Sequence, residues 1–259
     1  MRYRILHLIP CGPSILLATA ILFAAAQDQP PQPPPQQAQT AKPQLTPEQR
    51  GDIYMARRMY REAIEAYQSV QPPTAVILNK IGIAYQQMGD LDSAKKMYER
   101  AIKLNKKYPE AINNLGTIHY ARKSYRRAIS AYKKALQLNP DSASIYSNLG
   151  TAYFARKDYR RAVECYQKAL SLDPDVFERR GTAGVLLQER SVEERAKFHY
   201  YLARVYAQNG RNDLALFYIR KSLEEGFKEK NRYLEEDVFA EIRKLPEFEE
   251  IMKIEPRVL

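Results

Sequence analysis

The sequence predicts an all-helical protein, an α-solenoid of about five helix-turn-helix units with a C-terminal helical cap. Three near copies of one eight-residue string carry this prediction: ARRMYREA at 56–63, ARKSYRRA at 121–128 and ARKDYRRA at 155–162. Weaker copies begin at Gln87 and Gln208, so successive copies are 31, 34, 34 and 53 residues apart. A period of 34 residues is typical of stacked helix pairs. The composition agrees, because Ala, Leu, Lys, Arg, Glu and Tyr dominate and strand-like alternation is scarce.

The first 26 residues have the pattern of a signal peptide. Arg2 and Arg4 precede an apolar stretch at 15–26, and Ala24-x-Ala26 fits a signal-peptidase site. We expect cleavage after Ala26, while the longer uncharged run from Ile5 leaves open a retained membrane anchor that tethers the protein. Either outcome predicts an exported protein of the bacterial periplasm or cell envelope. Residues 27–45 are rich in Pro and Gln and predict a disordered linker.

The helix pairs are expected at 46–74, 75–108, 109–142 and 143–176, followed by an insertion at 177–190 and a fifth pair at 191–229. Thr46 with Gln49, and Ser191 with Glu194, form predicted capping boxes at helix starts. Three further residues are placed to cap second helices and two prolines to end them: Asp90, Ser124, Asp158, Pro140 and Pro174.

Small and aromatic residues recur at helical spacing inside each unit. We expect Gly150 and Ala162 to let two helices approach closely, and Tyr153, Tyr159 and Tyr166 to fill the space around them. The earlier units repeat the glycine and the last tyrosine as Gly116 and Tyr132, Gly82 and Tyr98, and Gly51 and Tyr67. The Arg and Lys residues of the repeated string then face water.

The run NNLGTIHYARKSYRRAISAYKKALQLNP resembles a tetratricopeptide repeat, and the resemblance covers residues 44–176 and roughly 191–229. It implies a right-handed superhelix, and the leader suggests a bacterial exported member of this family. Lys123 and Lys157 stand where the family usually has a turn glycine, which raises a question about the turn geometry. The stretch from Leu202 to Ile251 resembles closing segments of such exported repeat proteins, and after Gly226, a predicted helix end, residues 230–259 are expected to form the C-terminal cap. Their apolar residues predict short capping helices: Phe239, Ile242, Phe248 and Ile251.

The sequence offers no catalytic constellation. His7, His119 and His199 lie apart from one another and from any Cys with ligand spacing, and Cys11 and Cys165 are far apart. Nucleophile-elbow, phosphate-loop and zinc-protease motifs are missing. We therefore expect a protein that is not an enzyme and that carries no metal and no cofactor.

The resemblance implies that the residue two before each repeat glycine faces a concave groove, often as an Asn that contacts a peptide backbone. These residues are Asn114 and Asn148, with Lys80 in the second unit. An alternative is that the two Asn residues satisfy only local backbone groups. The favoured function is a non-catalytic scaffold of the cell envelope that binds an extended peptide or partner protein. The candidate groove residues are Asn79, Asn113, Asn114, Thr117, Tyr120, Ser147, Asn148, Thr151, Phe154, Tyr200 and Arg204.

A second candidate surface is the basic edge formed by the repeated inter-helix turns. The chain has a net charge of +11, which suits anionic partners. The alternative function is an electrostatic adaptor that binds lipid, acidic glycan or acidic protein; a plain solvated edge is the simpler interpretation. Nucleic acid is disfavoured, because most tyrosines are expected in the packing between helices. The edge consists of Arg57, Arg58, Arg61, Arg122, Lys123, Arg126, Arg127, Arg156, Lys157, Arg160 and Arg161.

Overall fold

A computed structural model describes residues 45–178 and 191–255, which contain helices and turns and no strand. The predicted signal peptide or anchor, nearly all of the linker, and most of the insertion lie outside these residues. The first helices of the five pairs are α1 (Pro47–Ala56), α3 (Ala75–Gln87), α5 (Pro109–Ala121), α7 (Ala143–Ala155) and α10 (Val192–Gln208). The second helices are α2 (Tyr60–Gln68), α4 (Leu91–Leu104), α6 (Tyr125–Leu138), α8 (Tyr159–Leu172) and α11 (Asn212–Glu224).

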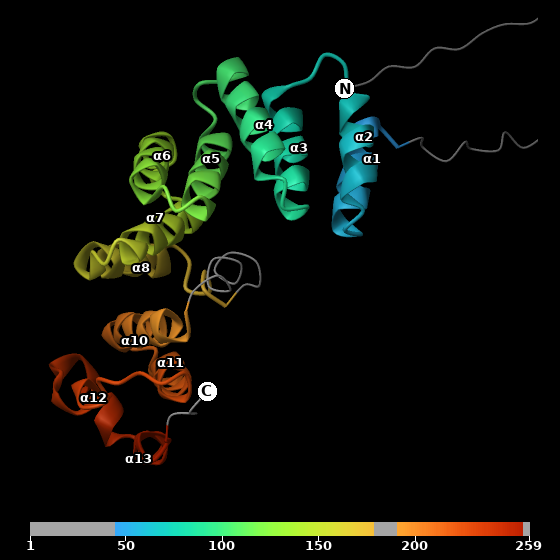
Figure 1. The fold of residues 1–259 in the computed structure, drawn as a ribbon. Helices are drawn as coiled ribbons and strands as arrows, with labels where there is room; N and C mark the ends of the chain where they lie inside the picture. Colours follow the sequence, from blue (N-terminus) through green and yellow to red (C-terminus); the bar gives the residue numbers. More distant parts are fainter. Residues whose placement is uncertain (1–44, 179–190, 256–259) are drawn as a thin grey trace, which may run out of the picture. The chain divides into compact units, whose positions relative to one another are not determined.

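The helix pairs stack in sequence order (Figure 1). Each second helix packs on the first helix of the next pair: α2 on α3, α4 on α5, α6 on α7 and α8 on α10. First helices also contact one another, α3 with α5 and α5 with α7. This arrangement confirms the predicted all-helical solenoid, in which each unit buries its apolar surface against its neighbours.

In each of the first four pairs, a tyrosine ring of the second helix packs against a glycine of the first helix. The glycines are Gly51, Gly82, Gly116 and Gly150, and the rings belong to the tyrosines 16 residues later: Tyr67, Tyr98, Tyr132 and Tyr166. A Cβ atom on any of these glycines would lie between 2.3 and 2.7 Å from a ring carbon. Because the rings are almost fully buried, they have no free space into which to move. The sequence predicted the close approach, and the structure identifies the tyrosine that requires it.

The fifth pair replaces this contact with a different combination. Ala203 occupies the glycine position on α10, and Ile219 occupies the tyrosine position on α11. Both are fully buried. Compared with the other four pairs, the first helix gains the methyl group of Ala203, and the second helix has Ile219 in place of a larger tyrosine. The total side-chain volume between the two helices is therefore roughly kept.

The hydroxyl groups of the four buried tyrosines also find partners. In three pairs the hydroxyl donates to the residue that follows the glycine, and these bonds are Tyr67 to Asp52 at 2.7 Å, Tyr132 to Thr117 at 3.3 Å and Tyr166 to Thr151 at 3.4 Å. In the second pair that position is the apolar Ile83, and Tyr98 donates to Gln86 at 2.9 Å instead. A buried hydroxyl without a partner costs free energy, so each pair satisfies it locally.

Most predicted helix caps are present. Thr46 and Gln49 form the complete capping box of α1. Asp90 and Asp158 accept from the backbone N–H groups of the first turns of α4 and α8. Ser191 accepts from Glu194 N at 3.2 Å at the start of α10. The prediction for Ser124 was wrong in one respect, because it is the N-cap residue of α6 but its side chain makes no capping hydrogen bond.

The turns inside the pairs adopt one conformation whatever residue they contain. Gly89 and Gly210 have φ angles of 80° and 69°, in the left-handed region that favours glycine. Arg58, Lys123 and Lys157 occupy the same place with φ angles of 60°, 57° and 61°. The turns with Arg or Lys in place of the family's glycine therefore keep the same geometry. Each of these Arg and Lys residues adopts the left-handed conformation, which costs an L-residue about 1–2 kcal/mol.

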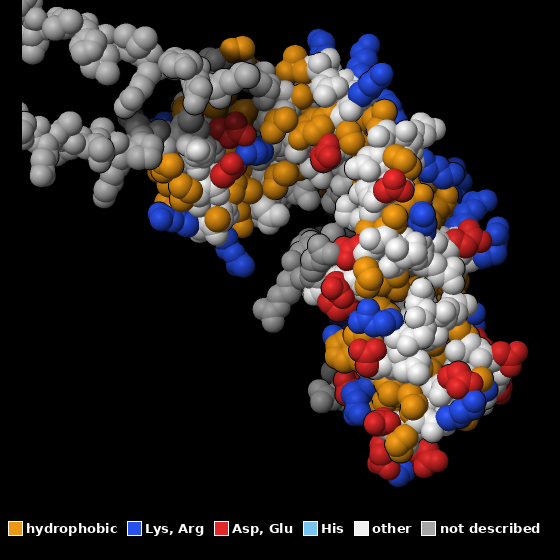
Figure 2. Space-filling model, turned by 180° about the vertical axis from the view of Figure 1, so that it is seen from behind, with side chains coloured by type: hydrophobic (Ala, Val, Ile, Leu, Met, Phe, Trp, Pro, Cys, Tyr) orange, Lys and Arg blue, Asp and Glu red, His pale blue; other side chains and the backbone are white. Residues whose placement is uncertain are grey.

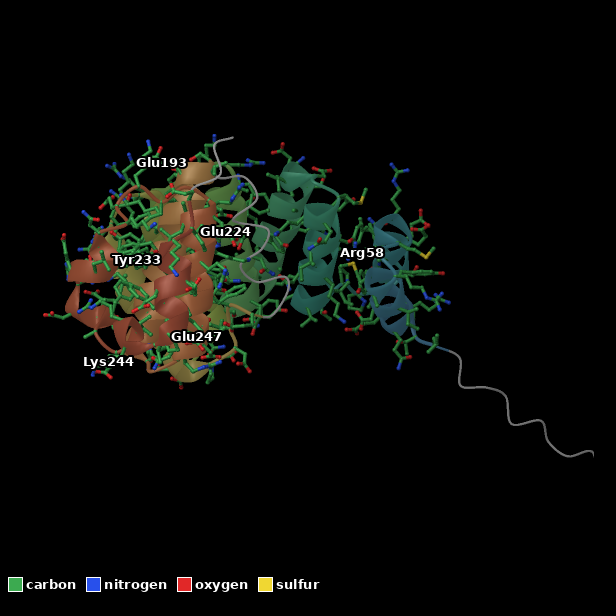
Figure 3. The ribbon with its side chains drawn as sticks, turned by 90° about the horizontal axis from the view of Figure 1, so that it is seen from below. Arg58, Glu193, Glu224, Tyr233, Lys244 and Glu247 are labelled. Atoms are coloured by element: carbon green, nitrogen blue, oxygen red, sulfur yellow. The ribbon has the colours of Figure 1, made fainter. Side chains whose placement is uncertain are left out.

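The C-terminal segment covers the last pair as predicted. It consists of α12 (Arg232–Glu235), two short 3₁₀ helices, η1 (Asp237–Phe239) and η2 (Ile242–Lys244), and α13 (Pro246–Met252). These elements pack on α10 and α11, with Tyr233 among the C-terminal helices (Figure 3). The four predicted apolar residues are buried: Phe239, Ile242, Phe248 and Ile251.

The glycine–tyrosine contact makes a direct prediction for stability. Gly116→Ala places a methyl group against the buried ring of Tyr132, and we expect a loss of about 1–3 kcal/mol from overpacking. This loss exceeds the gain of about 1 kcal/mol from the higher helix propensity of Ala. Adding Tyr132→Ile copies the fifth pair and should recover part of the loss. Thermal unfolding followed by circular dichroism checks both; a Gly116→Ala protein as stable as wild type would contradict the packing.

The left-handed turns make a second prediction. Lys157→Gly removes the conformational cost and should stabilise the protein by about 1 kcal/mol. The matched control is Gly89→Lys, because a Cβ on Gly89 would meet nothing within 4 Å and only the backbone conformation is tested. It should destabilise by a similar amount. Urea-unfolding midpoints of both variants measure the effect, and equal midpoints for all three proteins would exclude it.

Candidate partner-binding surfaces

The candidate groove residues lie on the first helices, but they differ in exposure. Asn113, Asn114 and Thr117 on α5 and Arg204 on α10 are half-buried. The other candidates are buried, with at most 8% of their surface exposed: Asn79, Tyr120, Ser147, Asn148, Thr151, Phe154 and Tyr200. The accessible polar side chains among the candidates are therefore concentrated on α5, the middle of the array.

Four asparagines form a hydrogen-bonded ladder across three units. Nδ2 of Asn148 on α7 donates to Oδ1 of Asn113 at 3.0 Å, and Nδ2 of Asn113 donates to Oδ1 of Asn114 at 3.3 Å. Nδ2 of Asn114 donates to Oδ1 of Asn79 on α3 at 3.0 Å. The sequence left two interpretations open, a peptide contact or a bond to local backbone. The structure adds a third: the amides bond to one another between units. We call Asn79, Asn113, Asn114 and Asn148 the asparagine ladder.

At the N-terminal side an ionic contact takes the place of the ladder. Lys80 on α3 is in the repeat position of Asn114, and its Nζ lies 2.8 Å from Glu48 and 2.7 Å from Asp52 on α1. Burial lowers the pKa of Lys80, but the hydrogen bonds and charges of the two carboxylates outweigh it and the pKa lies above its usual value. Lys80 therefore joins the first pair to the second.

The C-terminal segment covers the candidate residues on α10. The hydroxyl of Tyr200, which has no exposed surface, donates to Glu236. Arg204 pairs with the same carboxylate at 3.2 Å, and the guanidinium of Arg232 lies 4.5 Å from the ring centre of Tyr200. Sequence reasoning missed this contact, because Glu236 is 36 residues from Tyr200 and belongs to no motif. Tyr200 is therefore not accessible to a binding partner.

All eleven side chains of the basic edge are exposed, and Lys and Arg side chains gather along one margin of the molecule in Figure 2. Arg58 projects from the first turn in Figure 3. Among the residues that the structure describes, three members of the edge have acidic partners: Arg122 with Asp92 at 2.5 Å, Arg160 with Glu164 at 2.9 Å, and Arg161 with Asp158 at 3.2 Å.

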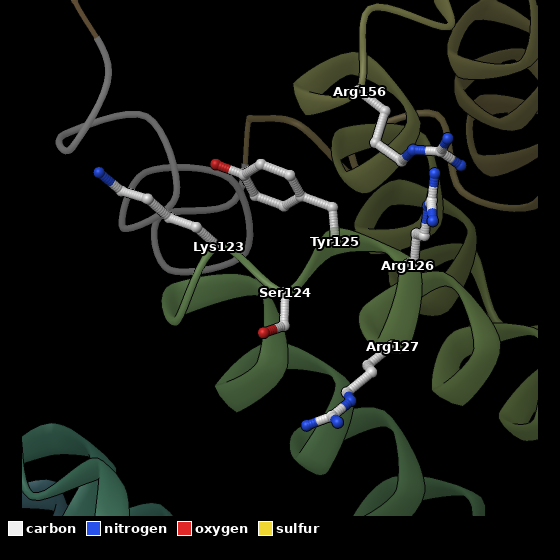
Figure 4. A pocket seen from close by; sticks show the side chains of 6 residues that line it. All are labelled: Lys123, Ser124, Tyr125, Arg126, Arg127 and Arg156. Carbon is white, nitrogen blue, oxygen red and sulfur yellow. The ribbon is translucent and has the colours of Figure 1, made fainter.

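A cavity of about 570 Å³ opens on this edge (Figure 4). It lies between the turn of the third pair and the turn of the fourth, and sequence reasoning did not predict it because the two turns are far apart along the chain. Its lining consists of Lys123, Ser124, Tyr125, Arg126, Arg127 and Arg156. A smaller cavity of about 200 Å³ lies between the first two pairs, with mostly apolar walls that include Leu78, Ile81 and Met97.

The cysteine and the two histidines within the described residues are buried or half-buried, and they pack against or pair with neighbouring side chains. Burial raises the pKa of the Cys165 thiol to about 12, as expected of a free cysteine packed in the core. His119 is half-buried, and burial together with Arg127 and Lys95 lowers its pKa. Nδ1 of the buried His199 lies 2.8 Å from Glu225.

Within residues 45–178 and 191–255, no three His, Cys, Asp or Glu side chains lie close enough together to bind a metal ion. No helix in these residues has the length and apolarity needed to span a bilayer.

The asparagine ladder predicts an energetic coupling between units. Asn114→Ala leaves Oδ1 of the buried Asn79 without its donor, which should cost about 1–3 kcal/mol. In the double variant Asn79→Ala/Asn114→Ala both partners are removed, so the loss should be smaller than the sum of the two single losses by about 1 kcal/mol. A double-mutant cycle of unfolding free energies measures this coupling. Strictly additive losses would show that the ladder contributes nothing across the units.

Several solved structures are similar to this chain. A MamA crystal structure is 25% identical and covers 71% of this chain and 97% of that chain, with a TM-score of 0.47. MamA 41-end from Desulfovibrio magneticus RS-1 is 21% identical over 68% of this chain and 90% of its own, also at 0.47. YrrB, titled a TPR protein with an unusual peptide-binding site, is 24% identical over 48% and 66%, at 0.42. Comparison with curated proteins gave no match.

Four family models match this chain, and all of them describe the same repeat. Models named tetratricopeptide repeat match residues 48–107, 143–176 and 196–225, and a model named TPR repeat matches residues 116–156. The matched ranges reach all five helix pairs and together cover more than half of the 259 residues. The chain therefore belongs to the tetratricopeptide repeat proteins.

Proposed function

We propose that this protein is a non-catalytic scaffold that binds an extended peptide or partner protein on the face formed by its first helices α3, α5 and α7. The observation that carries the proposal is the asparagine ladder, which places half-buried side-chain amides at the centre of this face. An amide offers donors and acceptors together, so it can pair with both the N–H and the C=O of an extended chain.

The ladder leaves hydrogen-bonding capacity for a ligand. Each Nδ2 atom carries two hydrogens, and the ladder uses one hydrogen of Asn113 and one of Asn114. Each amide oxygen likewise has a second lone pair. Because the ladder fixes the side chains in one orientation before a ligand arrives, little rotamer freedom is lost on binding. Asn113 and Asn114 are accordingly the residues that we expect to contact the partner backbone, with Thr117 one turn further along α5.

The proposal includes an envelope location. Its support is the sequence of residues 1–26, which has a basic start, an apolar stretch and small residues at a cleavage site. The Pro- and Gln-rich linker that follows would separate the helix pairs from the membrane if the leader is retained. Identification of the N-terminal residue of the mature protein by mass spectrometry tests this part, and an N-terminus at Gln27 would support export with cleavage.

The binding test compares proteins captured from envelope extracts by wild type and by Asn113→Ala/Asn114→Ala. Loss of two amide contacts should weaken binding of the authentic partner about tenfold. Wild type and the Asn113→Ala/Asn114→Ala variant must be compared at a temperature at which circular dichroism shows both to be folded, because the two substitutions also break the asparagine ladder.

A stability-matched control separates the two effects. Gly116→Ala is expected to lose a similar amount of stability but changes no exposed polar group. It should retain the partner at the same temperature. If both variants lose the partner equally, or if Asn113→Ala/Asn114→Ala retains it fully, the first-helix face of α5 is not the binding surface.

A further inference from the structure

We propose that the cavity on the basic edge binds the phosphate group of a small organic phosphate ester. The site goes beyond the scaffold function, because it lies at the turns between helices and not on the face that carries the asparagine ladder. It is formed by the α5–α6 turn and the start of α6 together with Arg156 at the end of α7. Two helix pairs must therefore be stacked for the cavity to exist.

The first argument is the way in which charges are paired on these two turns. Eight Lys and Arg residues of the basic edge lie here, and three of them have carboxylate partners: Arg122, Arg160 and Arg161. None of those three lines the cavity. The four cations that do line it make no ion pair with any described acidic residue, and these are Lys123, Arg126, Arg127 and Arg156. Four of the five cations on these turns that have no described acidic partner thus line one cavity, and the fifth, Lys157, lies outside it.

The second argument is electrostatic. Figure 4 shows the guanidinium groups of Arg126 and Arg156 directed toward one another from neighbouring helix pairs. Like charges that converge on one space repel, and the described residues that line the cavity include no carboxylate to offset them. An oxyanion placed between Arg126 and Arg156 would convert this repulsion into attraction, and Lys123 and Arg127 would add positive charge around it.

The third argument is the match between the lining and the ligand. Arg guanidinium groups present two parallel N–H donors that suit a phosphate group. The Ser124 hydroxyl makes no cap bond to α6 and can donate to a ligand oxygen. The ring of Tyr125 is held against Tyr120, with centroids 5.3 Å apart, and forms a wall. At about 570 Å³ the cavity has the size of a small-molecule site and exceeds a bare phosphate, so the phosphate should be carried by a small polar group such as glycerol.

The experiment uses glycerol 2-phosphate in solution and vesicles of phosphatidylcholine with or without phosphatidylglycerol. Wild-type protein should bind glycerol 2-phosphate in calorimetry, and Arg126→Gln/Arg156→Gln should weaken binding by at least about tenfold. The matched control is Arg160→Gln/Arg161→Gln, which removes the same charge from the same edge but outside the cavity. It should bind as wild type does.

The outcomes are distinct. If both double variants lose affinity equally, the attraction is a diffuse field and the site does not exist; if wild type binds neither probe, the proposal is also overturned. Binding to glycerol 2-phosphate alone identifies a soluble ester as the ligand, and cavity-dependent binding to phosphatidylglycerol vesicles identifies a lipid headgroup. Asn113→Ala/Asn114→Ala should leave both affinities unchanged, so failure of the scaffold proposal and failure of this one are separable.

Discussion

The contact on which this architecture depends is a tyrosine ring pressed against the backbone of a neighbouring helix at a glycine. It sets the distance between the two helices of a pair, and it recurs four times with the same spacing of 16 residues. The helices are individually short, at 9–14 residues in these pairs, and helices of this length are marginal alone. Their stability therefore comes from packing inside a pair and between successive pairs, with the tyrosine hydroxyl bonded to a nearby side chain.

The fold could be predicted from the sequence because each of its determinants is local. The repeated string, the glycine and tyrosine positions and the prolines after α6 and α8 lie within one unit, so one chain suffices to read them. Ser124 shows the limit of this reasoning, because a residue of the right type at the right place need not direct its side chain to the helix. The Ala203 and Ile219 pair could also be read from the sequence, but only after the structure had identified which tyrosine faces the glycine.

The candidate site was harder to predict, since it depends on contacts between units. Family resemblance pointed to Asn114 and Asn148, but the bonds from Asn148 to Asn113 and from Asn114 to Asn79 join residues of different helix pairs. Side-chain orientation across such a boundary is not encoded in a local pattern. The cavity at Arg126 and Arg156 has the same origin: its four cations belong to the basic edge predicted from the sequence, but the sequence could not show which of them lack a described acidic partner.

The closing segment has a consequence for any chain that lies along the first helices. Glu236 bonds to the Tyr200 hydroxyl, Arg232 lies over its ring and Phe227 stacks on it, so Tyr200 is closed to such a chain. Arg204, which is paired with Glu236, is the half-buried candidate that remains on α10. If a segment binds along α3, α5 and α7 as we propose, it would meet Arg204 but not Tyr200 on α10. The C-terminal segment would then limit how many contacts such a segment makes at that end of the array.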